Sequence, residues 1–89
     1  MPYRIVRYDD TPNPNALKCI LDRTVAPGPR SYRSADQAAA DPVAAALFAV
    51  PGVTGLLFAD GWLTVSKAPE KPWKSIKPGV ERALAAAPE

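Results

Sequence analysis

The sequence contains no histidine and only one cysteine, Cys19. The absence of histidine excludes histidine-based catalytic triads, histidine general bases and histidine metal ligands. A single cysteine excludes an intrachain disulfide, a CxxC redox pair and a four-thiolate zinc or iron–sulfur site. One free thiol without bridges is typical of a reducing compartment, so we expect a cytoplasmic protein.

The sequence also lacks a strong charge of one sign and any long hydrophobic run. Eleven basic residues stand against nine acidic ones, and the net charge of +2 is too small to indicate nucleic-acid binding by itself. No hydrophobic stretch approaches the roughly 20 residues of a membrane span, and residues 1–10 show no signal-peptide pattern. We therefore expect a monomeric, non-enzymatic protein without cofactor, bound metal, membrane contact or nucleic-acid partner.

The 89 residues are enough for one small domain, residues 1–89, with a modest two-layer core. Residues 3–8 are rich in β-branched and aromatic side chains and predict a first strand. Residues 16–22 alternate between apolar and polar and predict a half-buried second strand. One face of this strand carries Leu17, Cys19 and Leu21, and the other carries Lys18 and Ile20.

Two amphipathic helices are predicted in the rest of the chain. Asp41 followed by Pro42 is typical of a helix start, with a carboxylate N-cap before a proline in the first turn. This start predicts a helix over residues 43–50. A second helix is predicted over residues 73–87, in which Pro78 should either produce a kink or mark the true first residue.

Residues 53–59 and 62–67 predict a hairpin around Asp60-Gly61, a turn that favours positive φ at both central residues. A two-residue turn fixes the register, because residues at equal distances from it must pair. Phe58 then lies opposite Leu63 on one face. The same register places Leu57 and Trp62 on the other face.

The predicted order is β-β-α-β-β-α, which indicates the α+β class. We expect a two-layer sandwich of an antiparallel sheet of about four strands with two helices on one face. A short extra strand near residue 32 and a helical turn over residues 34–40 are optional additions. The sheet face opposite the helices would then be open to solvent.

The open face gives the first candidate site. Its apolar residues are rimmed by polar groups, a pattern that favours a protein contact surface. Partial cover by the first strand, or a chance scatter of apolar residues, is the alternative. The predicted partner-binding residues are Leu57, Trp62, Ile20 and Lys18.

A second candidate is the connector formed by Thr11, Pro12, Asn13, Pro14 and Asn15. Two prolines stiffen it, which favours a recognition loop whose conformation is already ordered before binding. The alternative is a purely structural connector that sets the pairing of the first two strands. Both interpretations can hold together.

Cys19 and a group of lysines each allow two interpretations. Cys19 is predicted to be a buried core residue, since its neighbours on the same face are apolar, although a reactive thiol is the alternative. The lysines surround the start of the last helix and indicate either an ordinary solvated face or a site for an anion or acidic partner. They are Lys67, Lys71, Lys74 and Lys77.

Several segments resemble the N-terminal domain of the Nfu (NifU-related) iron–sulfur scaffold proteins. They are residues 11–18 (TPNPNALK), 41–55 (DPVAAALFAVPGVTG) and 62–67 (WLTVSK), followed by Trp73 and Lys77-Pro78. The resemblance implies the fold and a link to iron–sulfur cluster assembly or delivery. In the family a further domain with a CxxC pair holds the cluster. This sequence reaches Glu89 before any such domain, so we expect a stand-alone N-terminal domain, and iron binding is implied only for the family.

Taken together, these features predict a non-catalytic protein-interaction or accessory domain associated with iron–sulfur cluster assembly or delivery. Its partners would be cluster assembly factors or client proteins. Two alternatives remain open: an iron or cluster carrier that dimerises through Cys19, and a nucleic-acid binder that uses a basic patch.

Overall fold

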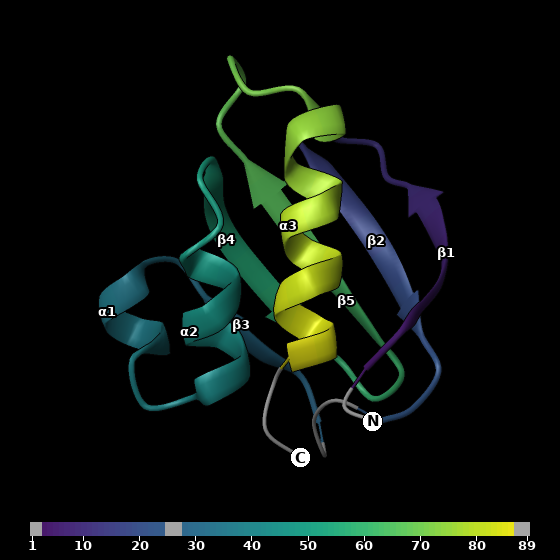
Figure 1. Cartoon of the computed structure of the whole chain (residues 1–89), viewed down its shortest axis with the longest axis vertical. Coiled ribbons are helices and arrows are strands. Elements are labelled where there is room, and N and C mark those ends of the chain that lie inside the picture. The colour runs from purple at the N-terminus through teal and green to yellow at the C-terminus, as the bar shows by residue number, and fades with distance from the viewer. Residues whose placement is uncertain (1–2, 25–27, 87–89) are drawn as a thin grey trace.

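The computed structural model describes residues 3–24 and 28–86, which form an antiparallel sheet covered on one face by helices (Figure 1). The strand order is β1-β2-β5-β4-β3. The strands are β1 (Ile5–Asp10), β2 (Ala16–Leu21), β3 (Arg30–Tyr32), β4 (Val53–Phe58) and β5 (Trp62–Lys67). The helices are α1 (Ala35–Ala38), α2 (Pro42–Phe48) and α3 (Trp73–Ala86).

The α+β class and the antiparallel sheet are confirmed, and both optional additions are present. The short strand near residue 32 is β3, which makes the sheet five-stranded. The helical turn is α1, whose N-cap Ser34 accepts a hydrogen bond from the backbone N–H of Gln37. The sheet therefore has the four expected strands and, at its edge, the optional fifth strand β3.

The first strand begins later than the sequence predicted, at Ile5 instead of residue 3, and extends to Asp10. A bulge between Ile5 and Arg7 leaves Val6 with 58% of its surface exposed. The extra residue lets Ile5 face the helices while Arg7 pairs with Ile20 on the open side. A bulge depends on the partner strand, so alternation within residues 3–8 did not reveal it.

The β4–β5 hairpin has the predicted register but a different turn. Phe58 pairs with Leu63. The backbone N–H of Ala59 donates to the carbonyl oxygen of Trp62 over 2.9 Å. However, neither Asp60 nor Gly61 has a positive φ, so the predicted turn conformation was wrong. The closing hydrogen bond fixes the register without any residue in the left-handed region.

The start of α2 is stabilised as the sequence predicted. Asp41 Oδ1 accepts hydrogen bonds from the backbone N–H groups of Val43 (3.1 Å) and Ala44 (3.3 Å). Its other oxygen accepts a 2.8 Å bond from the hydroxyl of Tyr32. Burial, with this bond second, raises the pKa of Tyr32. One carboxylate therefore ties the helix start to the edge strand β3.

Helix α3 runs through Pro78 without a break, whereas a kink or a later start was expected. Its buried residues are Ile76, Val80 and Leu84, spaced four apart along one stripe. Packing of this stripe on the sheet offsets the backbone hydrogen bond that a proline cannot donate. The predicted helix end at residue 87 lies outside the described residues.

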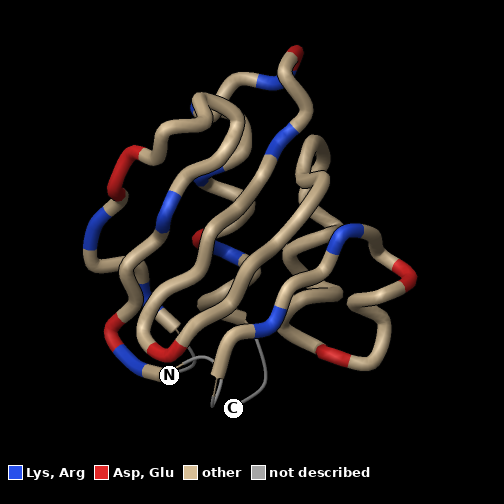
Figure 2. Tube along the Cα trace, turned by 180° about the vertical axis from the view of Figure 1, so that it is seen from behind, with Lys and Arg blue, Asp and Glu red and all other residues tan. Residues whose placement is uncertain are grey.

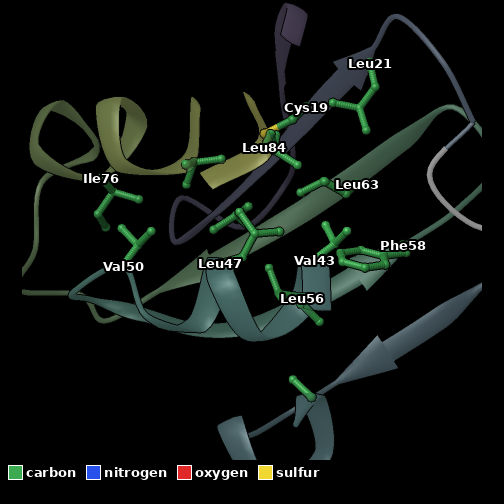
Figure 3. Packing of buried hydrophobic residues seen from close by; sticks show 14 residues of the cluster. Cys19, Leu21, Val43, Leu47, Val50, Leu56, Phe58, Leu63, Ile76 and Leu84 are labelled. Atoms are coloured by element: carbon green, nitrogen blue, oxygen red, sulfur yellow. The ribbon is translucent and has the colours of Figure 1, made fainter. Parts of the chain in front are cut away.

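The core lies between the sheet and the helices, and Figure 3 shows its side chains at close range. It takes alternate residues from β2, β4 and β5 and the buried stripes of α2 and α3. Figure 3 labels Cys19 of β2 and Leu84 of α3 among these side chains. The inward set on β2 is the predicted one: Leu17, Cys19 and Leu21.

Candidate functional site

The face of the sheet opposite the helices is open, and Figure 2 views the molecule from this side with no helix in front of the strands. Ile20 on β2 pairs with Trp62 on β5. Thr64 pairs with Lys18 on one side and with Leu57 on the other. The structure therefore places all four predicted partner-binding residues on one patch across β2, β5 and β4. We call Lys18, Ile20, Leu57 and Trp62 the open-face patch.

The open-face patch is only partly exposed. Leu57 has 39% of its surface exposed, while Trp62 and Ile20 are half-buried. The Lys18 ammonium lies over the Trp62 ring, 4.4 Å from its centroid. A cation in this position is attracted by the electron-rich ring face and covers part of the indole. The patch thus offers a flat, mixed surface of apolar groups with one basic group.

The rim of the patch is formed by β1. Arg7 Nε and Asp9 Oδ1 form an ion pair of 3.0 Å. The hydrogen bond from Arg7 is the main reason that the pKa of Asp9 is lowered, and Lys18 adds a weaker attraction. These three charges leave one net positive charge beside Trp62, which favours a partner with a negative group at that point.

The β1–β2 connector is held by its own polar groups. Thr11 Oγ1 lies within hydrogen-bond distance of the carbonyl oxygens of Asn13 (2.8 Å) and Ala16 (2.9 Å). Asn13 Oδ1 accepts a 2.9 Å bond from the backbone N–H of Asn15. Such short-range bonds replace the ladder bonds that Pro12 and Pro14 cannot make.

The connector is also fastened to the helix side of the sheet. The indole N–H of Trp73 donates to the carbonyl oxygen of Pro14 over 3.1 Å. The Lys67 ammonium donates to Asn15 Oδ1 over 3.1 Å and lies 5.5 Å from the Trp73 ring centroid. The structural-connector interpretation therefore has direct support, and its recognition role stays a prediction.

Lys67 corrects one expectation from the sequence. It was grouped with lysines on a solvated face, but only 9% of its surface is exposed. The reason is strand alternation, because Lys67 follows Leu63 and Val65 on the buried side of β5. The period-two pattern contained this signal, and the amide acceptor that makes the burial tolerable comes from the distant Asn15.

A pocket of about 410 Å³ lies between the connector and the first turns of α3. It is lined by residues 10–14, Ala16, Leu17, Trp73 and Lys77. In Figure 1 the β1–β2 connection lies beside the first turn of α3. Sequence reasoning missed this pocket, because its walls come from segments about 60 residues apart that only the fold brings together.

Lys77 lies in this pocket with its ammonium 4.6 Å from the centroid of the Tyr8 ring. The Tyr8 hydroxyl donates to Glu81, one turn further along α3. Burial, followed by this bond, raises the pKa of Tyr8. Lys71 and Lys74, by contrast, are exposed. The four lysines of the sequence analysis therefore occupy different environments.

Cys19 is buried, with 1% of its surface exposed, as the core interpretation predicted. Burial raises the pKa of its thiol to about 12, and the opposing effect of Lys77 is smaller. The electrostatic effects of Lys77 and Glu81 on Cys19 could not be predicted from the sequence, because these residues lie about 60 positions away along the chain. A thiol that is buried and protonated at neutral pH is a poor nucleophile and a poor metal ligand.

No metal-binding arrangement exists in the described part of the chain. Within residues 3–24 and 28–86, no group of three or more Cys, Asp or Glu side chains is placed to hold a metal ion. The same ranges contain no helix long and apolar enough to cross a membrane.

Solved structures share this fold. A NifU-like protein from Saccharomyces cerevisiae superimposes with a TM-score of 0.74 at 28% identity, covering 93% of this chain and 76% of that one. Protein SAV1430 from Staphylococcus aureus superimposes with a TM-score of 0.75 at 22% identity, covering 90% of this chain and 96% of that one. The second similarity concerns the fold alone.

Sequence comparisons identify relatives over most of the chain. The mitochondrial "NFU1 iron-sulfur cluster scaffold homolog" of Drosophila grimshawi is 36% identical over 77 residues, which are 84% of this chain and 26% of that protein. The human protein of the same name is 36% identical over 81 residues, 88% of this chain and 32% of that protein. This chain thus spans about a quarter to a third of those relatives. The family described as "Scaffold protein Nfu/NifU N terminal" matches residues 6–88, and the chain belongs to this family.

Proposed function

We propose that this chain is a non-catalytic protein-interaction domain associated with iron–sulfur cluster assembly or delivery, and that it binds a protein partner through the open-face patch. Family membership supports the link to cluster assembly, because relatives are named as iron–sulfur cluster scaffolds. The relatives named as scaffolds are about three times as long as this chain, which matches one part of them. A binding role needs only this part.

The observation that carries the binding role is the placement of Trp62. The hairpin register turns this large side chain away from the core, where it contributes less to folding than a buried aromatic residue would. Tryptophan is also among the residues most enriched at the energetic centres of protein interfaces. A half-buried Trp62 flanked by Leu57 and Ile20 gives such a centre on an otherwise polar sheet face.

The chemistry of the patch indicates the kind of partner. Its apolar groups fit an apolar patch on another protein, and its net positive charge fits a carboxylate placed opposite Lys18. Trp62→Ala should therefore weaken binding by roughly 2 kcal/mol or more. Lys18→Gln should weaken it less and reduce its dependence on salt.

The test is quantitative capture from a lysate of the source cells with tagged wild-type protein, Trp62→Ala and the matched control Ser66→Ala, which lies on the same face. The proposal is supported if the captured partner is itself a cluster assembly factor or an iron–sulfur protein and is lost only with Trp62→Ala. Unchanged capture by Trp62→Ala contradicts the proposed surface. Loss of the fold in Trp62→Ala contradicts it as well, and is checked by circular dichroism.

The geometry gives no support to a cluster carrier that dimerises through Cys19, because this thiol is buried in the core and its pKa is raised. Anaerobic reconstitution with iron and sulfide tests this alternative directly. A brown protein with stoichiometric iron would revive the carrier and count against the interaction role. The relatives named above are mitochondrial, so the expected cytoplasmic compartment stays a prediction, as does the monomeric state.

A further inference from the structure

The pocket between the β1–β2 connector and α3 lies on the other side of the sheet from the open-face patch, and the proposed function does not use it. Its apolar wall is formed by Leu17, Trp73 and the two connector prolines. Two charged residues line it, Asp10 and Lys77. A volume of about 410 Å³ is enough for one or two side chains of a peptide.

The walls of the pocket are already in place. The Trp73 indole is fixed by its bond to the carbonyl oxygen of Pro14, and Asn15 is fixed by Lys67. The hydroxyl of Thr11 and the side-chain oxygen of Asn13 close the connector on itself. A ligand would therefore meet a rigid surface and would not have to order a loop on binding.

The charges in the pocket are not neutralised by each other. Between the described residues no ion pair joins Lys77 to any carboxylate, Asp10 included, and the Lys77 ammonium contacts the Tyr8 ring instead. Lys74 lies one turn before Lys77 on the same side of α3 and is exposed. Two like charges three residues apart destabilise a helix slightly, so this arrangement is not explained by helix stability.

We propose that this pocket binds a short acidic segment of a protein partner, with a Glu or Asp carboxylate at Lys77 and a neighbouring apolar side chain against Trp73. Lys74 adds attraction at the rim. Asp10, on the wall formed by the end of β1, accepts a backbone N–H of the segment and repels a second carboxylate. This selects a single acidic residue beside an apolar one over a polyanion such as nucleic acid, whose closely spaced phosphates would meet Asp10.

The inference rests on the proposed function only in that the ligand belongs to a protein. It is tested by NMR titration of ¹⁵N-labelled protein with the capped peptides Ac-Gly-Glu-Leu-Gly-NH₂, Ac-Gly-Gln-Leu-Gly-NH₂ and Ac-Gly-Lys-Leu-Gly-NH₂. The Glu peptide should shift the Trp73 indole N–H and the amides of the connector, and should bind about fivefold or more tightly than the Gln peptide. The Lys peptide should bind most weakly, and about 0.5 M salt should remove most of the preference.

Two variants locate the effect. Lys77→Gln should abolish the preference for Glu over Gln, while Lys77→Arg, which keeps the charge, should retain it. Arg82→Gln is the matched control, because it removes one positive charge from an exposed position of α3 that does not line the pocket, and it should leave the preference unchanged. Well-dispersed amide spectra establish that each variant is folded.

The inference would be overturned by equal affinities for the Glu and Gln peptides or by a preference that survives Lys77→Gln. It would also be overturned by an oligothymidylate that shifts the same signals at lower concentration than the Glu peptide. Other results distinguish a failure of the pocket assignment from a failure of the proposed function. If Lys18→Gln and Trp62→Ala abolish peptide binding, the acidic segment belongs on the open-face patch and only the pocket assignment is wrong. If Trp62→Ala leaves capture unchanged while Lys77→Gln removes the Glu preference, the pocket stands and the open-face patch does not.

Discussion

The two faces of β5 carry alternate residues of one six-residue strand and have opposite properties. Leu63 and Val65 point toward the helices and are buried, whereas Thr64 and Trp62 point away and are only half-buried. The side chains of the covered face must therefore fit in size and shape against their neighbours, because the core is closely packed. The open face is free of that constraint, so a large side chain there is available for contacts with another protein.

Two lysines, one on each face of the sheet, show the same difference between the faces for charged side chains. Lys18 lies over Trp62 on the open face, and Lys67 lies near Trp73 on the covered face. Lys67 is buried and donates to Asn15 and to the carbonyl oxygen of Ala68, while no hydrogen bond joins Lys18 to a described residue. A buried ammonium needs such acceptors, whereas the half-buried Lys18 keeps part of its surface in contact with water. Lys67 thus joins the connector to the end of β5, whereas Lys18 makes no comparable bond within the described residues.

Truncating an aromatic residue on each face should give the largest difference. Phe58 is 1% exposed and makes an edge-to-face contact with Tyr32, with ring centroids 5.7 Å apart. Phe58→Ala should lower the free energy of unfolding by about 3–5 kcal/mol, enough to unfold much of a small domain. Trp62→Ala should cost clearly less. Urea titration measures both, and equal costs for the two variants would mean that the faces do not differ as described.

The lysine comparison predicts a smaller effect. Asn15→Ala removes the acceptor of the Lys67 ammonium and should cost about 1.5–3 kcal/mol, as expected for a hydrogen bond to a charged group. Lys67→Met should recover part of this loss in the Asn15→Ala background, because the unpaired buried charge is gone. Lys18→Met is the control and should change stability by less than about 0.5 kcal/mol. Additive costs for Asn15→Ala and Lys67→Met would show that the bond contributes nothing.

Elements defined by local patterns could be predicted from the sequence. Alternation placed Cys19 inside, the Asp41-Pro42 pair placed the start of α2, and the hairpin spacing placed Trp62 on the open face. In each case the signal lies within a few residues. The family resemblance agreed with these elements, and the comparisons confirmed it.

Features that need a distant partner could not be predicted. The bulge at Val6 depends on the pairing of β1 with β2. The pocket needs Trp73 beside a connector that precedes it by about 60 residues. The path of α3 through Pro78 depends on packing against the sheet, which outweighs the local helix-breaking tendency. The residues of the open-face patch could therefore be predicted from the sequence, whereas the pocket on the covered side of the sheet could not.

Cys19 gives the last test, because it distinguishes a core thiol from a functional one. Cys19→Val should leave fold and partner binding intact and cost less than about 1.5 kcal/mol, as near-isosteric apolar replacements do. A thiol-specific reagent should label the native protein slowly, through rare opening of the core. Rapid labelling of the folded protein would contradict the buried assignment.

The pH dependence of stability gives a second test of the buried Cys19 thiol. The pKa of Cys19 is raised from an ordinary value near 9 to about 12 in the folded protein, so above pH 9 the unfolded chain loses a proton that the folded chain keeps. Stability from this group is therefore complete below pH 9 and falls as the pH rises toward 12, by about 1.4 kcal/mol at about pH 10.

Tyr8, whose pKa is also raised, contributes a loss in the same direction at higher pH in both proteins. Urea titrations of wild type and Cys19→Val at about pH 7.5 and about pH 10, with a reducing agent present, should therefore show the larger loss in the wild type. Equal losses in the two proteins would mean that Cys19 ionises as easily in the folded chain as in the unfolded one, and the covered face would then be open enough at β2 for thiol chemistry.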